Sequence, residues 1–288
     1  GGGGATETLF ADLVRSTGAL ASFNQNYGFI GTPGNDTTSI RYLPTLVNGQ
    51  PIANVVAANN GIVGGWAIIN GDHFATWLPG QGLGAMSNTE DGFRNYDSTN
   101  LSTALATDNV NDGTARTISA SKTVNSLRFA GGVTHTIAAG QTLTINTGGI
   151  LSNTNAAHGL TGGSLTSNTG DLTVFVNQNT MTIGSSIVGN IALTKGGNAT
   201  LDLTGANSYT GATYVGVGGS TSNDDRAGNL RLNLTGANGT TSVSIPGNLH
   251  IYNSQVEELQ PNQIAESADV YLYGGSRLYL HNAAGITE

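Results

Sequence analysis

The sequence has no cysteine, few charged residues and no long apolar run. The absence of cysteine among its 288 residues excludes disulfide bonds and thiolate metal sites. Only 10% of the residues are charged, against roughly 25% in ordinary soluble domains, and 6% are aromatic. No segment approaches the roughly 18 consecutive apolar residues of a membrane-spanning helix. We therefore predict no membrane span in this chain.

Positive charge is also scarce. Ten Lys and Arg residues stand against 18 Asp and Glu residues, which gives a formal net charge of -8. Nucleic-acid binding needs clustered Lys and Arg to neutralise phosphates, and here they are scattered along the chain. We predict no nucleic-acid partner, and the same charge disfavours anionic membrane surfaces.

Glycine, with 43 residues, and the small polar residues Asn, Thr and Ser are abundant instead. Such a composition can indicate disorder, but disordered chains have few β-branched residues and a high net charge. Here Val, Ile, Leu and Thr recur in short strand-like runs. The composition indicates a folded, turn-rich, all-β protein with enough apolar residues for a substantial core.

The chain divides into three parts. Residues 1–4 are four glycines, which we interpret as a linker or placeholder. Residues 5–116 form an N-terminal flanking or capping region with hairpins, and residues 117–288 carry strand repeats. Near the N-terminus, Leu9, Phe10, Leu13 and Val14 recur at helical spacing, which predicts one short helix within residues 5–30.

Two Asn-Gly pairs mark tight turns farther along the N-terminal region. Asn48-Gly49 and Asn70-Gly71 each stand between extended runs. Because Asn and Gly tolerate the positive φ of a type I′ turn, both pairs predict β-hairpins. Residues 80–100 lack a sustained period and are expected to form a long loop or irregular flank.

Beyond residue 117, short segments with alternating apolar residues recur every 20 to 30 residues. The alternation places every second residue on one buried face. This spacing is typical of a solenoid, although a β-sandwich stays an alternative on periodicity alone. The pentapeptide LTGAN occurs twice, at residues 203–207 and 234–238. The segments are residues 125–132, 141–149, 170–178, 199–207, 229–238, 248–254 and 268–282.

One segment carries a more specific pattern. Residues 193–219, LTKGGNATLDLTGANSYTGATYVGVGG, contain a Thr-Lys-x-Gly entry, a Leu-x-Leu strand, Gly-Ala-Asn-x-Tyr-x-Gly and a Thr-x-Val strand. In that order they resemble the autotransporter-associated β-strand repeat of bacterial surface proteins. Segments like those around this repeat cover most of residues 120–288. The resemblance implies a right-handed parallel β-helix and an extracellular or bacterial cell-surface location.

Within that resemblance the repeat residues have scaffold roles. We expect leucines inside the narrow helix, glycines at corners that need left-handed backbone, an asparagine in a corner or bonded to an adjacent rung, and a tyrosine stacked beside a neighbouring coil. The motif residues are Leu201, Leu203, Gly205, Asn207, Tyr209, Gly211 and Val215.

Exposed aromatic residues are the candidate interaction face. Alternation places Tyr271, Tyr273 and Tyr279 opposite the leucines of their strands, where they could stack on sugars. A lateral brace or a subunit contact is the simpler interpretation. Trp66 and Trp77 are expected to be exposed as well.

No cluster carries a clear catalytic or metal-binding pattern. Histidines 23 residues apart could stack around a metal or glycan, but without a third ligand we expect an exposed loop pair. Adjacent carboxylates are expected on solvated loops, so we predict no enzyme, no cofactor and no metal. The residues considered are His135 and His158, Asp224 and Asp225, Glu257 and Glu258 with Glu266 and Asp269, and Asp72 with His73.

The sequence favours a structural or interaction protein. We expect an adhesive surface rod that assembles head-to-tail with itself into a fibre or surface layer, because unpaired strand edges at its ends can accept another chain. The alternative is a polysaccharide-binding or polysaccharide-degrading β-helix module, with host or matrix glycans as partners.

Overall fold

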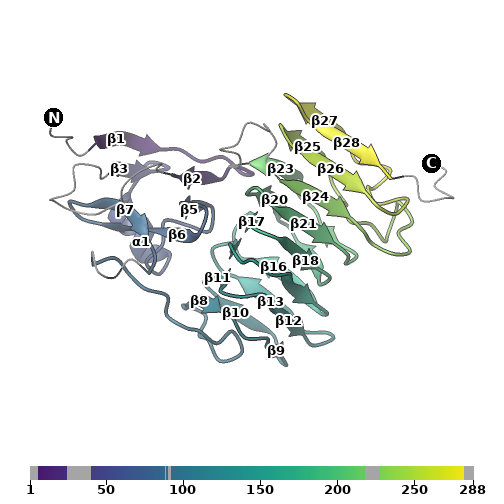
Figure 1. Ribbon diagram of the computed structural model, residues 1–288, viewed down its shortest axis with the longest axis horizontal. Helices are drawn as coiled ribbons and strands as arrows, with labels where there is room; N and C mark the ends of the chain where they lie inside the picture. Colours follow the sequence, from purple (N-terminus) through teal and green to yellow (C-terminus); the bar gives the residue numbers. More distant parts are fainter. Residues whose placement is uncertain (1–5, 25–39, 88, 90–91, 218–227, 282–288) are drawn as a thin grey trace.

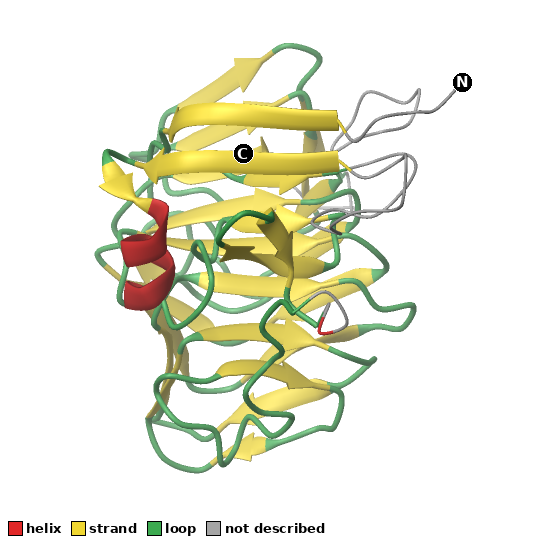
Figure 2. Cartoon of the chain, turned by 90° about the vertical axis from the view of Figure 1, so that its left-hand side faces the viewer, coloured by secondary structure: helices red, strands yellow, loops and turns green. Residues whose placement is uncertain are grey.

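The computed structural model describes residues 6–24, 40–87, 89, 92–217 and 228–281. Its strands form two units, a parallel solenoid and a smaller N-terminal module (Figure 1). The solenoid strands lie side by side from β8 and β9 to β27 and β28, and the module lies against one side of them. Figure 2 shows how completely strands dominate and how small the one described α-helix is.

The solenoid has three parallel sheets, and most of its rungs add one strand to each. Its strands make eight rungs, or about seven turns, which confirms the predicted parallel β-helix. The first sheet consists of β8 Asn109–Asp112, β11 Ser126–Phe129, β14 Gly149–Ser152, β17 Asp171–Val176, β20 Ala192–Gly196, β23 Thr213–Val217, β25 Leu249–Tyr252 and β27 Val270–Tyr273. The second consists of β9 Thr117–Ile118, β12 Thr134–Ile137, β15 His158–Thr161, β18 Thr180–Ile183, β21 Thr200–Leu203, β24 Asn229–Leu232, β26 Gln255–Glu258 and β28 Arg277–Leu280. The third consists of β10 Lys122–Val124, β13 Thr142–Ile145, β16 Ser164–Ser167, β19 Ser186–Gly189 and β22 Ser208–Tyr209.

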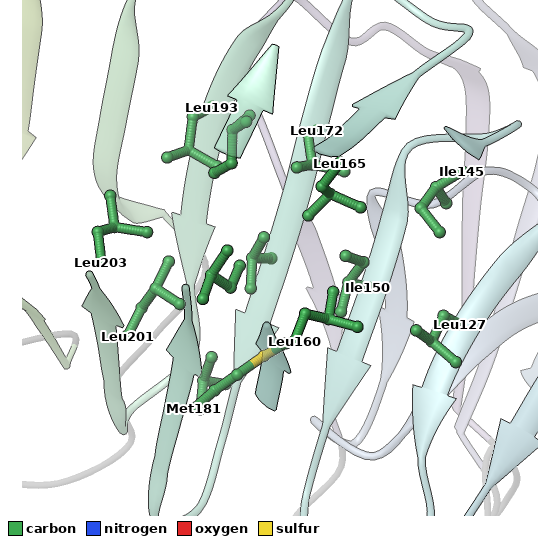
Figure 3. Close-up of a cluster of buried hydrophobic side chains, with 14 of the residues drawn as sticks. Leu127, Ile145, Ile150, Leu160, Leu165, Leu172, Met181, Leu193, Leu201 and Leu203 are labelled. Carbon is green, nitrogen blue, oxygen red and sulfur yellow. The ribbon is translucent and has the colours of Figure 1, made fainter. Parts of the chain in front are cut away.

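Columns of apolar side chains fill the interior. Leu143 pairs with Leu165 in the third sheet, and Leu201 lies between Met181 and Leu230 in the second. Figure 3 shows such side chains from all three sheets meeting between the ribbons. Burying one of them contributes about 1.5–3 kcal/mol, so each rung gains stability only where its neighbours cover it. This is the core that the alternating pattern predicts.

The N-terminal module consists of two small sheets and the helix. Both Asn-Gly hairpins are present, since β3 pairs antiparallel with β4 around Asn48-Gly49 and β5 with β6 around Asn70-Gly71. All four turn residues have positive φ, between 49° and 74°, as the type I′ prediction requires. The strands are β1 Thr6–Leu13, β3 Ile40–Val47 and β4 Gln50–Pro51 in one sheet, and β2 Ala21–Phe23, β5 Ala67–Ile69, β6 His73–Leu78 and β7 Gly82–Ala85 in the other.

Two local predictions for the N-terminal region are wrong. The segment expected to be helical contains β1, which pairs in parallel with β3, so pairing with a distant strand outweighs the helical spacing of its apolar residues. The residues 80–100 expected to be irregular begin with β7, antiparallel to β6. The described helix is instead α1, Ile52–Ala58, which follows Pro51 and buries Ile52 in the module core.

The module packs on the outer surface of the first sheet. Leu151 and Phe175 point outward from β14 and β17 and are buried against Ile68 and Phe74 of the module. Two ion pairs join the same surfaces, Arg15 with Asp171 and Arg128 with Asp72. The module therefore covers the side of the solenoid, and its apolar contact makes the two units one packed body.

The contact between module and solenoid depends on glycine at one point. A Cβ added to Gly65 would overlap the backbone nitrogen and Cα of Gly149 on β14. Gly65→Ala is expected to destabilise the docked state by about 2 kcal/mol, because the backbones must move apart. The measurement is urea unfolding with limited proteolysis between module and solenoid. Gly170→Ala is the matched control, since its added Cβ meets nothing within 4 Å, and equal stability of the two variants would contradict the prediction.

Candidate functional site

The repeat motif lies in the middle of the solenoid. Leu201 and Leu203 of β21 point into the interior and are fully buried, as is Val215 of β23. Val215 lies between Lys195 on β20 and Ile251 on β25 in the register of the first sheet. These positions make the motif a segment of the packed interior.

The two motif glycines permit close approach between rungs. A Cβ on Gly205 would lie 2.6 Å from the carbonyl oxygen of Ser185, and one on Gly211 would lie 2.6 Å from that of Ile191. Neither glycine adopts a positive φ. The left-handed corner expected from the sequence is therefore wrong at both positions, and the physical requirement is the space beside a neighbouring backbone.

Asn207 and Tyr209 form buried hydrogen bonds between and within rungs. Asn207 accepts a hydrogen bond from the Ile187 amide and donates its side-chain amide to the Ser244 carbonyl, both at 2.8 Å. Tyr209 is buried in the core, where its hydroxyl lies 2.5 Å from the hydroxyl oxygen of Thr213. Burial raises the pKa of Tyr209, so the phenol stays neutral.

Lys195, the lysine of the motif, is completely buried. It pairs with Val174 and Val215, and its side chain follows theirs into the interior. The Nζ donates a hydrogen bond of 2.7 Å to the Gly197 carbonyl. Burial lowers the pKa of Lys195 to about 7, because the charged ammonium loses its hydration. The buried amine therefore lowers the free energy of unfolding, whereas an apolar side chain at this position would not.

The most prominent aromatic cluster is a two-column ladder on the outer surface of the first sheet. His250 stacks between Tyr214 and Tyr271, with ring centroids 5.1 Å and 4.5 Å away and interplanar angles of 17° and 6°. In the second column Tyr252 and Tyr273 stack at 4.4 Å and 4°. These separations match the spacing of paired strands, so the sheet itself sets the stack.

The ladder changes what its tyrosines can offer to a ligand. Tyr252, Tyr271 and Tyr273 are 36%, 39% and 41% exposed, but each ring has a face against a ring of the next rung. Sugars stack on ring faces, whereas a stacked column presents mainly ring edges and hydroxyl groups to its side. Tyr279 lies on β28 in the second sheet, so it does not share the face of Tyr271 and Tyr273.

Sequence reasoning missed three members of this ladder. Tyr214, His250 and Tyr252 were not recognised, although His250 and Tyr252 alternate with Leu249 and Ile251 as Tyr271 and Tyr273 alternate with Val270 and Leu272. Aligning those two segments supplies the missing signal. The tryptophans are not on an exposed strip either: Trp66 is buried, with Arg15 5.4 Å above its ring, and Trp77 packs half-buried on the module core.

The carboxylates considered for catalysis do not form a pair. Glu257 and Glu258 are neighbours on β26, a strand and not the expected loop, so they point to opposite sides. Glu257 faces outward, 3.6 Å from Arg231, while Glu258 is 7% exposed and points inward. Asp269 accepts a hydrogen bond from Tyr271, and Glu266 packs beside Gly239. Asp224 and Asp225 lie outside the described residues.

A polar cluster holds the β5–β6 hairpin on the solenoid. Asp72 lies 3.2 Å from His73 Nε2 and pairs with Arg128 of β11, whose Nε also donates to the Asp72 carbonyl at 2.7 Å. Burial alone would raise the pKa of Asp72, but the hydrogen bond from His73 and the charge of Arg128 hold it well below its ordinary value. The carboxylate therefore stays ionised and keeps the hairpin docked.

The same cluster has the residue types of a serine hydrolase, but its hydroxyl and imidazole groups do not have the hydrogen-bond geometry of a catalytic triad. The Ser87 hydroxyl lies 3.4 Å from both ring nitrogens of His73, and the Tyr96 hydroxyl lies 3.4 Å from Nδ1. Proton transfer requires a hydroxyl directed at one nitrogen at shorter distance. The arrangement favours a docking contact over a nucleophile with its base.

His135 and His158 lie in the core, so the exposed loop pair expected from the sequence is wrong. Both flank Phe129, with ring centroids 5.1 Å and 5.2 Å from it, on strands β12 and β15. Burial lowers the pKa of His135 to about 4 and also lowers the pKa of His158. No group of three or more metal-ligating side chains occurs among the described residues, and none of the described helices is long and apolar enough to cross a membrane.

The buried amine predicts a pH-dependent effect of Lys195→Met. Between pH 7 and 10.5 the unfolded chain binds a proton that the folded chain does not, so the wild type gains stability as pH rises through this window. The variant is expected to be more stable than wild type by about 1–3 kcal/mol at pH 7. This difference in the free energy of unfolding is expected to shrink toward pH 10. Urea unfolding at both pH values measures it. Lys122→Met, at the partly exposed second lysine, is the control, and a gap independent of pH would contradict the prediction.

The buried His135 predicts a loss of stability at acidic pH. Because the pKa of His135 is lowered from 6.5 to about 4, acidification from pH 6.5 to 4 protonates the unfolded chain first. Wild-type stability is expected to fall by at most about 3 kcal/mol across this window from His135. His135→Leu removes that component, which thermal unfolding at pH 7 and pH 4.5 measures. Identical slopes for variant and wild type would show that His135 does not titrate in this way.

Comparison with known proteins agrees with the fold. No family model and no solved structure matches the chain. A curated protein that does match is the adhesin BmaC autotransporter of Brucella suis biovar 1 (strain 1330), which is 31% identical over an alignment of 234 residues that covers 75% of this chain. The chain spans about 6% of the length of that relative. The parallel solenoid and this weak homology together fit an autotransporter passenger-like β-helix.

Proposed function

We propose that the chain is a stretch of an adhesive β-helical rod displayed outside the bacterial cell. The observation that carries the proposal is the eight-rung parallel solenoid together with its similarity to an autotransporter adhesin. Every rung is tied to the next by backbone hydrogen bonds, so such a rod can hold a contact surface away from the cell. The matched relative is named as an adhesin, which supports a binding and not a catalytic role.

The sides of the rod suit contact with a partner. Rows of hydroxyl groups run across the rungs of the third sheet, for example Thr123, Thr144 and Thr166, which are neighbours in register. On the first sheet the aromatic ladder offers tyrosine edges and hydroxyls. Tyrosine is enriched in binding interfaces because one rigid side chain supplies apolar area and a hydrogen-bonding group. We place the adhesive contact on this ladder.

Adhesion through the ladder can be tested with coated beads. Beads that carry the protein are expected to attach to an extracellular-matrix gel, and the variant Tyr252→Ser/Tyr271→Ser/Tyr273→Ser to attach about tenfold less, because about 1.4 kcal/mol of binding energy corresponds to that factor. Tyr279→Ser on the second sheet is the matched control. Wild-type beads that attach no better than albumin-coated beads would reject adhesion, and equal attachment of the triple variant would reject the ladder as its surface.

Two further possibilities can be tested. Head-to-tail assembly into a fibre is favoured by strand edges at the first rung, where β9 and β10 end their sheets. Electron microscopy at several protein concentrations distinguishes filaments from isolated rods.

A polysaccharide-binding or polysaccharide-degrading module is the alternative. Its degrading form needs paired carboxylates, whereas Glu257 and Glu258 point to opposite sides. Glycan-array binding that survives loss of the ladder would favour a glycan module.

A further inference from the structure

The third sheet of the solenoid has an outer surface of its own along the side of the rod. The N-terminal module docks on the first sheet, at Leu151 and Phe175, whereas the outward side chains of the third sheet are half-buried or exposed. Five successive strands, from β10 to β22, contribute to this surface. It therefore does not depend on the unpaired strand edges at the ends of the rod.

The outward side chains of the third sheet stand in register as two columns of hydroxyl groups. On β13 and β16 two hydroxyl residues flank an inward-pointing leucine, Leu143 or Leu165. Val188 interrupts one column, which resumes at its neighbour Ser208. The columns are Thr123, Thr144 and Thr166, and Thr142, Ser164 and Ser186.

A column of asparagine side chains borders the two hydroxyl columns. Asn168 donates its side-chain amide to the Asn146 oxygen at 3.0 Å, and Asn146 donates to the Asn125 oxygen at 3.4 Å. Farther along, the Thr210 hydroxyl donates to the Asn190 oxygen at 2.7 Å. These bonds run along the rod and hold the side chains in place, so less conformational entropy is lost when a ligand binds beside them.

The surface of the third sheet is almost free of charge. In its five strands, all of which are described, the one charged residue is Lys122, and its ammonium is turned to the Ala104 carbonyl. On the second sheet, by contrast, Asp202, Arg231 and Glu257 are outward neighbours in register. The third sheet therefore suits an uncharged ligand that hydroxyl groups can recognise.

The hydroxyl groups of this surface repeat in two directions. Neighbouring strands lie about 4.8 Å apart, and alternate residues of one strand lie about 6.6 Å apart. Water molecules in hexagonal ice repeat at distances of the same order along two perpendicular axes. Each threonine also carries a methyl group beside its hydroxyl, and water next to an apolar group has restricted orientations. Water ordered on this surface can therefore continue into an ice lattice.

We propose that the third sheet binds ice through the hydroxyl columns of β13, β16 and β19. Ice matches the surface better than a glycan does, because a single sugar chain meets a two-dimensional array along only one line. The hydroxyl groups both donate and accept hydrogen bonds, as the water molecules of the lattice do. This site is distinct from the aromatic ladder, and its ligand goes beyond the proposed adhesion to a partner surface.

Slow growth of ice in a dilute solution of the full chain tests the proposal, because an ice-binding protein enters the crystal while other solutes stay in the liquid. The variant Thr142→Tyr/Thr144→Tyr places two bulky rings across both columns on β13. Thr134→Tyr/Thr136→Tyr is the matched control, since these residues form the same Thr-x-Thr pair on β12 of the second sheet. Ser164→Tyr on β16 is a second third-sheet variant. Thermal unfolding checks each fold, and either third-sheet variant that keeps the wild-type midpoint is sufficient.

The wild type and the second-sheet control are expected in the ice fraction, with added albumin left in the liquid. A third-sheet variant is expected to lose this enrichment and to stay with albumin. Wild type that stays in the liquid, or a folded third-sheet variant enriched as wild type is, would overturn the proposal. Light scattering at the same concentration detects self-association. Particles formed by wild type but not by the third-sheet variants would overturn the proposal in favour of a contact between copies of the chain.

Discussion

The stacking of one rung on the next is the interaction on which the structure depends. Each rung contributes few apolar side chains, and these are buried only because the adjacent rungs continue the same columns, as Leu201 does between Met181 and Leu230. Backbone hydrogen bonds fix the spacing, and side chains at equivalent positions then lie in contact along the rod. A rung without a neighbour would expose both its apolar interior and its unpaired backbone.

This constraint decides which departures from an apolar interior are tolerated. Asn207 is accepted because it bonds to Ile187 and Ser244 at once, so its amide has partners on two sides. Lys195 and His135 are different, since burial lowers the pKa of both and each destabilises the fold when it must carry a charge. Stability is therefore expected to depend on pH in the alkaline range through Lys195 and in the acidic range through the core histidines His135 and His158.

The outer surface of the solenoid accepts more kinds of side chain than the interior, and its parts make different contacts. The first sheet carries apolar residues where the N-terminal module docks, with the Asp72–Arg128 and Arg15–Asp171 pairs at that contact. Farther along the same sheet, the surface becomes the stacked ladder of Tyr214, His250 and Tyr271. Elsewhere the outer surface includes rows of hydroxyl groups on the third sheet and the ring edges of the ladder.

The sequence by itself determined the all-β class, the alternating core and the two Asn-Gly hairpins, because period-two patterns and positive-φ turns are local properties. Periodicity left a β-sandwich open, and the parallel β-helix followed from the resemblance of residues 193–219 to a known repeat. Only the tertiary structure decided that β1 is a strand, that Gly205 and Gly211 serve close approach, that His135 and His158 are buried, and that Tyr279 lies apart from Tyr271 and Tyr273. The aromatic ladder likewise joins residues from separate rungs. Such contacts depend on the register between distant strands, which no local pattern specifies.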